Sequence, residues 1–298
     1  MKRCAALAIL AGLFVGAGAG QAQVTIKLKE RGEGEAALAK KNETTSSKVT
    51  VADGQGNVVL DQKEVKTEIV EYKETVFKRK PGKAVTKLQR EYGKVQSGKD
   101  GALEDGALAG KTVLIEKVLD KFVFTYKDGE AVEGDAATAL TKDFSKKSDS
   151  NAELEKLVLP TKAVKTGESW KIDMPKIVEE LIKQGPMELD GAKSKGEGKL
   201  LKTYKKNGAL YGEMLFKMEM PILTIGKGQQ QLKFSDGAKI VMDMAFDVCI
   251  DGTSEAGTLK LKMLMVGTAT VPAAPGTVAT LNVSVDATQV QIDATKKK

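Results

Sequence analysis

The sequence predicts a mainly β protein of the α+β class, in which a curved antiparallel sheet or incomplete barrel carries two or three short helices in the middle of the chain. Beyond about residue 196, apolar and polar residues alternate over long stretches, which is typical of strands with one covered face. Signals for helices gather between residues 135 and 186. Strands and helices do not alternate regularly, so a doubly wound parallel sheet is disfavoured.

The first residues have the pattern of a secretory signal peptide. Lys2 and Arg3 form a basic start, Ala5–Ala19 is an apolar run, and small residues lead to Ala22. We expect cleavage after Ala22, with Ala19 as the alternative. The apolar run is shorter than the roughly 20 residues that span a bilayer. The chain is therefore predicted to be exported to the periplasm or secreted, with no transmembrane segment after cleavage.

Residues 23–298 are predicted to form a single β-rich domain, with a seam conceivable only at the glycine-rich residues 97–110 or within residues 135–186. In its first part the sequence predicts a strand at Val24–Lys29 and a short helix at Glu35–Lys41. The turn signal Asp53-Gly54-Gln55-Gly56 predicts a hairpin. The next segments are predicted as strands over 65–76 (where a helical spacing competes) and 85–92, a surface loop over 97–110, and a hairpin of 112–116 with 121–126.

Three helices are expected in the middle, followed by strands only. The helices are predicted at Asp135–Ser145, Asn151–Val158 and Pro175–Lys183, where proline lies in the first turn. Lys206-Asn207-Gly208 is the turn of a further hairpin. The strands expected after the helices are 199–204, 209–220, 240–250, 258–266 and 278–285.

The composition argues against most enzyme classes. The chain contains no histidine, the side chain that most often performs acid–base or metal chemistry near neutral pH. Of its two cysteines, Cys4 leaves with the signal peptide and Cys249 remains, so no internal disulfide can form. Cys249 lies in an apolar strand and is interpreted as a buried bystander. We predict no enzymatic activity, no catalytic residue and no cofactor.

The charge also argues against a nucleic-acid partner. The net charge is +7, but arginine occurs only at positions 3, 31, 79 and 90, and lysine carries the basic side. Nucleic-acid binding usually depends on arginine and on aromatic stacking. Lysine mixed with glutamate instead indicates a solvated surface.

Several short motifs resemble those of uncharacterised exported bacterial β-rich proteins, which form domain-of-unknown-function groups with a P…V-x-x-G-[DE]-[ST]-W element. The motifs are Leu88–Tyr92, Leu157–Pro160 followed by Val164–Trp170, and Cys249–Ser254. The resemblance implies a location in the envelope or outside the cell, and it implies no activity, ligand or site residue. Trp170, the only tryptophan, either anchors the core or lines a ligand site.

Methionine forms the sharpest local pattern of the chain. Residues two apart on a strand share a face, so each of three Met-x-Met pairs presents two thioethers together. Such a face can fill irregular gaps of a core, line a cavity for an apolar ligand, or bind Cu(I), because thioethers are soft ligands. The candidate ligand-binding residues are Met218, Met220, Met242, Met244, Met263 and Met265, with Met214 in the same phase.

Carboxylates offer weaker candidates for chemistry. Asp243 and Asp247 share a strand face, but four residues along a strand span about 13 Å, more than the separation in a glycosidase pair. Asp251-Gly252-Thr253-Ser254 is interpreted as a turn, because it lacks the alternating acidic ligands of a calcium loop. No residue is predicted to bind a metal through these groups.

Together these features predict a non-enzymatic exported protein of the cell envelope with a structural or interaction role. The alternative is a binding module that carries an apolar ligand or Cu(I) on the methionine-lined face. A hydrolase that uses only carboxylates, serine and lysine is a third hypothesis, which the absence of the usual bases disfavours.

Overall fold

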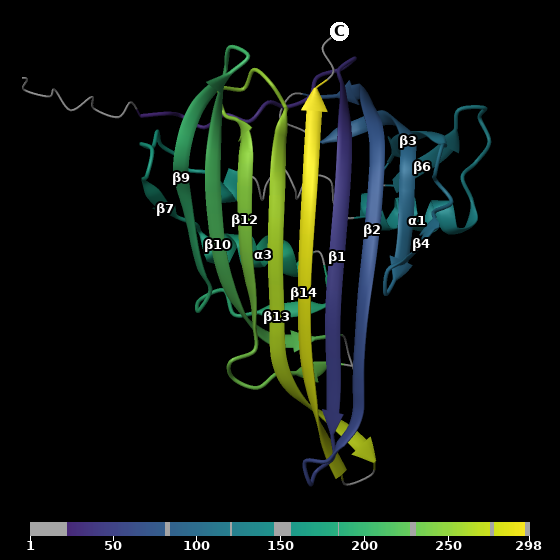
Figure 1. Cartoon of the computed structure of the whole chain (residues 1–298), viewed down its shortest axis with the longest axis vertical. Coiled ribbons are helices and arrows are strands. Elements are labelled where there is room, and N and C mark those ends of the chain that lie inside the picture. The colour runs from purple at the N-terminus through teal and green to yellow at the C-terminus, as the bar shows by residue number, and fades with distance from the viewer. Residues whose placement is uncertain are drawn as a thin grey trace, which may run out of the picture.

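A computed structural model of the chain shows one large antiparallel sheet with helices on one side (Figure 1). It describes residues 23–80, 84–119, 121–145, 156–183, 185–226, 231–274 and 277–295. The strands are β1 (Ala36–Ala52), β2 (Val58–Arg79), β3 (Val85–Lys99), β4 (Ala102–Asp105), β5 (Thr112–Val118), β6 (Lys121–Tyr126), β7 (Ser169–Lys171), β8 (Met187–Leu189), β9 (Lys195–Lys206), β10 (Ala209–Ile225), β11 (Leu232–Lys233), β12 (Lys239–Cys249), β13 (Gly257–Ala274) and β14 (Thr277–Thr295).

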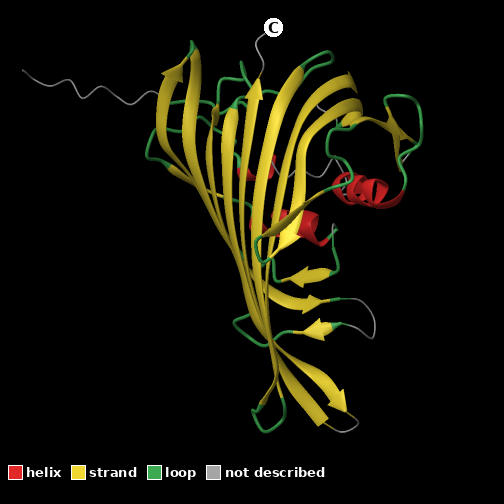
Figure 2. Ribbon diagram, turned by 45° about the vertical axis from the view of Figure 1, so that its right-hand side comes forward, coloured by secondary structure: helices red, strands yellow, loops and turns green. Residues whose placement is uncertain are grey.

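The sheet is open, which confirms the predicted fold class. Its strands run in the order β6-β5-β3-β2-β1-β14-β13-β12-β10-β9-β7, and β4, β8 and β11 pair at its sides. The two ends of this order, β6 and β7, are not paired with each other in the described part of the chain. The sheet is strongly curved, as Figure 2 shows.

The centre of the sheet joins the two ends of the described chain. β1 pairs with β14 from Ala37 opposite Thr295 to Ala52 opposite Thr280, and the two strands lie side by side in Figure 1. β1 also pairs along its whole length with β2. Every backbone group of β1 can therefore hydrogen-bond to a neighbouring strand.

The predicted hairpins form where the turn residues allow them. Lys206 and Ala209 pair across a two-residue turn in which Asn207 has a φ of 52° and Gly208 a φ of 83°. Both residues thus adopt the left-handed conformation that a tight hairpin turn with the twist of the strands requires. The hairpins around residues 53–56 and around Leu119 are also confirmed.

Two helices pack on the same side of the sheet (Figure 2). α1 (Gly134–Ser145) contacts β6, and α3 (Met174–Ile182) contacts β8. Both confirm predicted helices, and α3 has the expected proline in its first turn. Of the third predicted helix, residues 156–158 are helical, and the rest lies outside the described residues.

Three local predictions are wrong. The helix expected at Glu35–Lys41 is the start of β1, because pairing with β2 and β14 on both sides outweighs a weak local helix preference. Val24–Lys29 makes only two isolated bridges, Val24 to Val164 and Lys27 to Asp251. The loop expected over 97–110 contains a hairpin, since Asp100 and Gly101 turn β3 into β4 with φ values of 50° and 89°.

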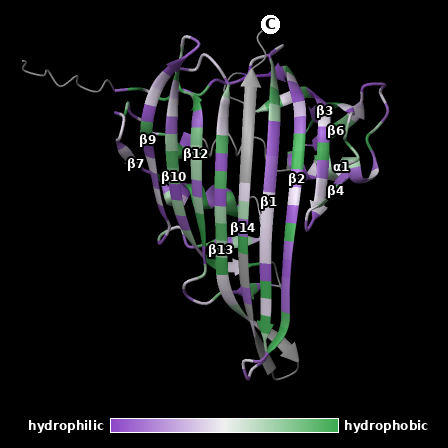
Figure 3. Ribbon diagram, in the orientation of Figure 1, coloured by the Kyte–Doolittle hydropathy of each residue, from purple (hydrophilic) through white to green (hydrophobic). Residues whose placement is uncertain are grey.

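The side chains divide the sheet into an inner face, on which α1 and α3 pack, and an outer face. On β10 the inner face carries Met214, Phe216, Met218 and Met220, and the intervening residues point outward. Figure 3 shows the corresponding alternation of hydrophobic and hydrophilic residues along β10 and β12. Strict alternation is therefore the signal that predicts which side chains are covered.

Two separate hydrophobic clusters lie on the inner face. The larger one joins β9, β10 and β12 to α3, with Leu200, Phe216 and Ile177 at its centre. The smaller one joins β3, β5 and α1, with Ile115 and Leu140 at its centre. The two clusters have no residue in common.

The predicted signal peptide, residues 1–22, lies outside the described residues. In the part that the structure describes, no helix combines the length and the apolar character that crossing a membrane requires.

Candidate functional site

The methionines of three different strands meet in one row on the inner face. Met242 of β12 lies opposite Met218 of β10 on one side and opposite Met263 of β13 on the other. Directly opposed residues of antiparallel strands have Cα atoms about 4.5–5.5 Å apart and point to the same face. The register therefore brings one member of each Met-x-Met pair side by side.

The row runs from a covered part of the inner face to a less covered part. Met218 and Met220 are 5% and 1% exposed, in a cluster that includes Met174 and Ile177 of α3. Met242, Met244, Met263 and Met265 are only partly buried at the margin of the same cluster. The apolar surface thus continues beyond the residues that the described helices cover.

Aromatic rings extend this surface across the sheet. Phe216 contacts Trp170 edge-on on one side and Phe246 on the other, with ring centroids 5.7 and 5.1 Å apart. The indole N–H of Trp170 donates a hydrogen bond of 2.8 Å to the carbonyl of Val158. A Cβ atom on Gly198 would lie 2.3 Å from the Trp170 ring, so only glycine fits there. Trp170 is therefore an anchor of the core in this structure.

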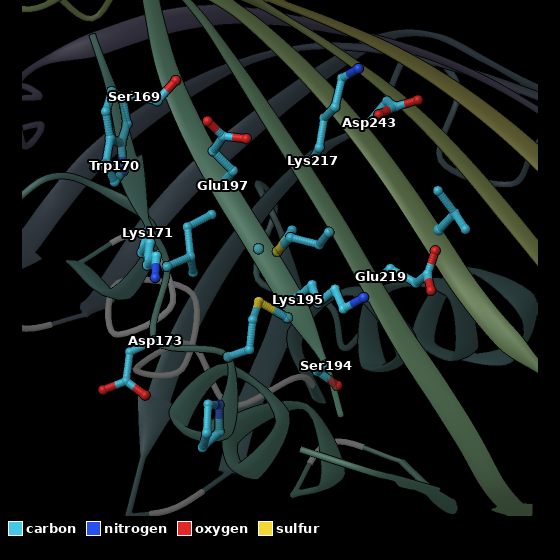
Figure 4. Close-up of a pocket in the computed structure, with 16 residues that line it drawn as sticks. Ser169, Trp170, Lys171, Asp173, Ser194, Lys195, Glu197, Lys217, Glu219 and Asp243 are labelled. Carbon is cyan, nitrogen blue, oxygen red and sulfur yellow. The ribbon is translucent and has the colours of Figure 1, made fainter. Parts of the chain in front are cut away.

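A hollow of about 1060 Å³ lies beside Trp170 and Met218 (Figure 4). Its apolar residues, such as Met174 and Met218, belong to the inner face, whereas Lys217 and Asp243 belong to the outer face. The strands run between these two groups of side chains. The hollow is therefore not one chamber, and of the six candidate methionines only Met218 lines it.

A smaller cavity of about 310 Å³ lies at one end of the methionine-lined strands. Phe246 and Val248 of β12 and Leu259 of β13 form its apolar wall, in the same inner-face phase as Met242, Met244 and Met263. Its polar residues are Lys29, Arg31, Cys249, Ser254, Glu255 and Thr258. The cavity therefore joins the apolar face to a polar end.

A chain of ion pairs begins at this polar end. Arg31 bridges Glu255 and Glu74 at 2.6 and 2.7 Å, and Arg90 bridges Glu74 and Asp143 at 2.7 and 2.5 Å. The side chains of Arg31, Glu74, Glu255 and Arg90 are only 10–17% exposed. Buried charges normally occur in such paired arrangements, because an unpaired charge is costly away from water.

Aromatic rings enclose the far end of this chain. The Arg90 guanidinium lies 4.3 Å from the centre of the Tyr72 ring and 4.6 Å from that of Phe144. Burial opposes its charge, but Tyr72, Glu74, Tyr92 and Asp143 outweigh burial and raise the pKa of Arg90 well above its usual value. Burial raises the pKa of Tyr92, against the opposing effect of Arg90.

This chain of ion pairs was not predicted from the sequence, although the scarcity of arginine was a signal for it. After the predicted signal peptide only Arg31, Arg79 and Arg90 remain as arginines. Arg79 pairs with Glu30 at 3.3 Å and donates to the backbone carbonyl of Arg31, so all three lie in one region. In a chain that otherwise uses lysine, this restricted use of arginine matches its fixed, multidentate geometry.

The predicted turn at Asp251 is present, with the Thr253 amide donating a hydrogen bond of 3.0 Å to the Asp251 carboxylate. Asp251 accepts hydrogen bonds from the Thr253 hydroxyl, the Leu210 amide and the buried Cys249 thiol, and these hold its pKa well below the usual value. Across the residues described, no group of three or more histidine, cysteine, aspartate or glutamate side chains could hold a metal ion.

The two aspartates of β12, Asp243 and Asp247, have different neighbours. Asp247 accepts a hydrogen bond of 2.5 Å from the Tyr204 hydroxyl. Burial and this hydrogen bond raise the pKa of Tyr204 to about 12. Asp243 lies between Lys217 and Lys262 in the ladder. The structure does not bring the two aspartates together as a pair.

Comparison with known proteins yields no family. No protein-family model matches the sequence, and no curated protein sequence matches it. A solved structure concerned with lipid-protein interactions in lipovitellin is similar with a TM-score of 0.43 and 7% identity, over 90% of this chain and 26% of that one. The chain thus spans about a quarter of the lipovitellin chain.

Two other solved structures are similar over most of this chain. An outer membrane channel from Pseudomonas putida F1 has a TM-score of 0.22 and 8% identity over 89% of this chain and 97% of its own. A structure described under asymmetric conductivity of engineered proteins has a TM-score of 0.19 and 9% identity, over 87% of this chain and all of its own. At these values the likenesses assign neither a family nor a function to this protein.

Proposed function

We propose that this protein is an exported binding module that holds an apolar ligand against the methionine-lined inner face of β10, β12 and β13. The observation that carries the proposal is the partial burial of Met242, Met244, Met263 and Met265 beside fully covered Met218 and Met220. An apolar surface that a helix covers completely is core, whereas its half-covered continuation can receive a ligand.

Methionine suits this role better than a branched side chain would. Its unbranched, polarisable side chain adapts to ligands of different shape. The neighbouring cavity of about 310 Å³ continues the same face past Phe246 and Leu259. A long apolar chain would thus contact the methionines along β12 and reach the cavity at the end of that strand.

Binding of the neutral fluorescent probe N-phenyl-1-naphthylamine tests the proposal. The double variant Met242→Gln/Met263→Gln keeps side-chain length but makes the inner face polar. We expect it to weaken probe binding by roughly thirtyfold, because each of the two replacements removes about 1 kcal/mol of apolar contact. The matched control is Val241→Gln/Leu264→Gln, the adjacent pair on the outer face of the same strands.

Two outcomes contradict this function. Failure of the unaltered protein to bind the probe would remove the proposed ligand site. An equal effect of both double variants would mean that binding does not depend on the inner face. Native mass spectrometry of the purified protein adds a second readout, since a co-purifying apolar molecule supports the binding module. A measured mass equal to that of the protein alone, together with no probe binding, supports instead the structural or interaction role in the envelope.

Cu(I) is a second candidate ligand, favoured by the row of Met218, Met242 and Met263. Three thioethers from adjacent strands supply the soft donors that Cu(I) prefers. Competition with a coloured Cu(I) chelator measures this binding. Loss of binding in Met242→Gln but not in Leu264→Gln would support copper, and unchanged chelator colour with the unaltered protein would exclude it. The predicted absence of catalysis stays a prediction.

A further inference from the structure

Glu255, at the polar end of the cavity, has a carboxylate oxygen without a partner. Glu255 lines the cavity, and its side chain is 10% exposed. Its Oε2 atom accepts a hydrogen bond of 2.6 Å from Arg31, whereas its Oε1 atom is buried and has no hydrogen-bond partner. A buried acceptor in this state is costly, because it has lost water and gained nothing in return.

The cations beside Glu255 are already engaged. Lys29 forms an ion pair of 2.7 Å with Glu35. Arg31 divides its guanidinium between Glu255 and Glu74. What Glu255 lacks is therefore a further hydrogen-bond donor, and an anionic group would meet no unengaged partner among these residues.

The unpartnered atom belongs to a carboxylate, which favours a cationic donor. The chain joins two guanidinium groups, Arg31 and Arg90, to three carboxylates, Glu255, Glu74 and Asp143. Asp143, at the far end, is 58% exposed, whereas the unpartnered oxygen belongs to the buried carboxylate beside the cavity. Hydrogen bonds between an ionised donor and a carboxylate are about twice as strong as neutral ones.

The other walls of the cavity are apolar and lead back to the methionines. Phe246, Val248 and Leu259 line it, and Phe246 follows Met244 and Met242 along the inner face of β12. A ligand that lies along this strand would thus have its apolar part on the methionines and its end at Glu255.

From this arrangement we propose that the ligand is an amphiphile with an amine head group, whose ammonium donates a hydrogen bond to Oε1 of Glu255. The proposal rests on the proposed function, because the tail of this amphiphile would occupy the methionine-lined face. It adds the chemical class of the head group and the residue that selects it. Glu255 would then be the residue that sets specificity.

Displacement of bound N-phenyl-1-naphthylamine by three amphiphiles with the same tail tests this assignment. The competitors are decylamine, decanol and decanoate, each used below the concentration at which it forms micelles. We expect decylamine to displace the probe at a concentration roughly tenfold lower than either of the others. In Glu255→Gln this preference should fall to within about twofold.

Glu219→Gln is the matched control, because Glu219 is an exposed carboxylate that pairs with Lys239 on the outer face. It should keep the preference for the amine. A thermal unfolding curve verifies that Glu255→Gln is folded. If that variant does not fold, Glu255→Asp provides the same measurement, because the shorter carboxylate withdraws from the cavity and should reduce the preference.

The outcomes separate this inference from the proposed function. If the probe binds but the three competitors act alike, the apolar site stands and the amine assignment is wrong. If decanol matches decylamine, Oε1 accepts from any donor, including water, and the assignment is again wrong. If the probe does not bind, the proposed function itself fails. An amine preference that persists in Glu255→Gln would place the head group elsewhere.

Discussion

Met242 of β12 lies directly opposite Met218 of β10, yet the two side chains are buried to different extents. Met218 is 5% exposed within the cluster that includes α3, and Met242 is partly buried at its margin. The boundary between core and candidate ligand surface therefore passes between two adjacent residues of one row.

This boundary predicts unequal effects of the same substitution. Met218→Ala should lower the free energy of unfolding by about 2–4 kcal/mol, because it leaves a cavity in a covered site. Met242→Ala should cost about 1 kcal/mol, since less apolar contact is lost. Urea denaturation followed by tryptophan fluorescence measures both values. Equal losses at the two positions would show that Met242 is core and would weaken the ligand proposal.

The contact between Gly198 and Trp170 predicts a strong effect of one methyl group. Gly198→Ala should destabilise the protein by about 1–3 kcal/mol, because the new Cβ overlaps the indole ring. It should also shift the fluorescence of the only tryptophan. Gly185→Ala is the control, since a Cβ there has no neighbour within 4 Å. Unchanged fluorescence in Gly198→Ala would contradict the packing.

The chain of ion pairs predicts that loss of Arg31 is costly. Arg31→Met leaves Glu74 without one of its two guanidinium partners and Glu255 without its hydrogen bond, so we expect a loss of about 3 kcal/mol. Lys202→Met removes one member of an exposed pair with Glu213 and should cost less than about 1 kcal/mol. Chemical denaturation at low and high salt measures the free energy of unfolding of both variants. If Arg31→Met lowers the free energy of unfolding no more than Lys202→Met does, the ion pairs of Arg31 are fully solvated.

The hydrogen bond between Tyr204 and Asp247 predicts a change of stability in alkali. The pKa of Tyr204 is raised to about 12 in the folded protein, against about 10 in an unfolded chain. The fold thus favours the protonated phenol. This stabilisation is complete below a pH of about 10 and disappears as the pH rises from about 10 to about 12.

Ultraviolet absorbance of tyrosinate during an alkaline titration checks this value. Tyr204→Phe should remove a phase that titrates near pH 12, and Asp247→Asn should move that phase to lower pH, whereas the late titration of the buried Tyr92 should persist in both variants. If Tyr204→Phe instead removes a phase near the ordinary tyrosine pKa of about 10, the hydrogen bond does not hold in solution.

Strand alternation predicted much of the candidate site. Because side chains alternate along a strand, the pattern of Met242, Met244 and Phe246 was enough to place them on one face. Which methionines face each other depends on register, and register is set by pairing between segments far apart in the chain. No local pattern shows that Met218, Met242 and Met263 form one row.

Long-range pairing also explains the main errors. Glu35–Lys41 has no strong strand pattern of its own, and it becomes a strand because β2 and β14 flank it. The role of Glu255 is similarly hidden, since its partner Arg31 is 224 residues away along the chain. The scarcity of arginine was visible in the sequence, but it could not show where the three guanidinium groups meet.

The pairing of β1 with β14 has a consequence for how the protein folds. Residues such as Ala37 and Thr295 must meet before the centre of the sheet exists, so neither half can complete its hydrogen bonding alone. Contacts this distant in sequence make folding slow. Until β14 is in place, β1 and β13 each present an unpaired edge, and the nascent molecule is open to mispairing with other chains.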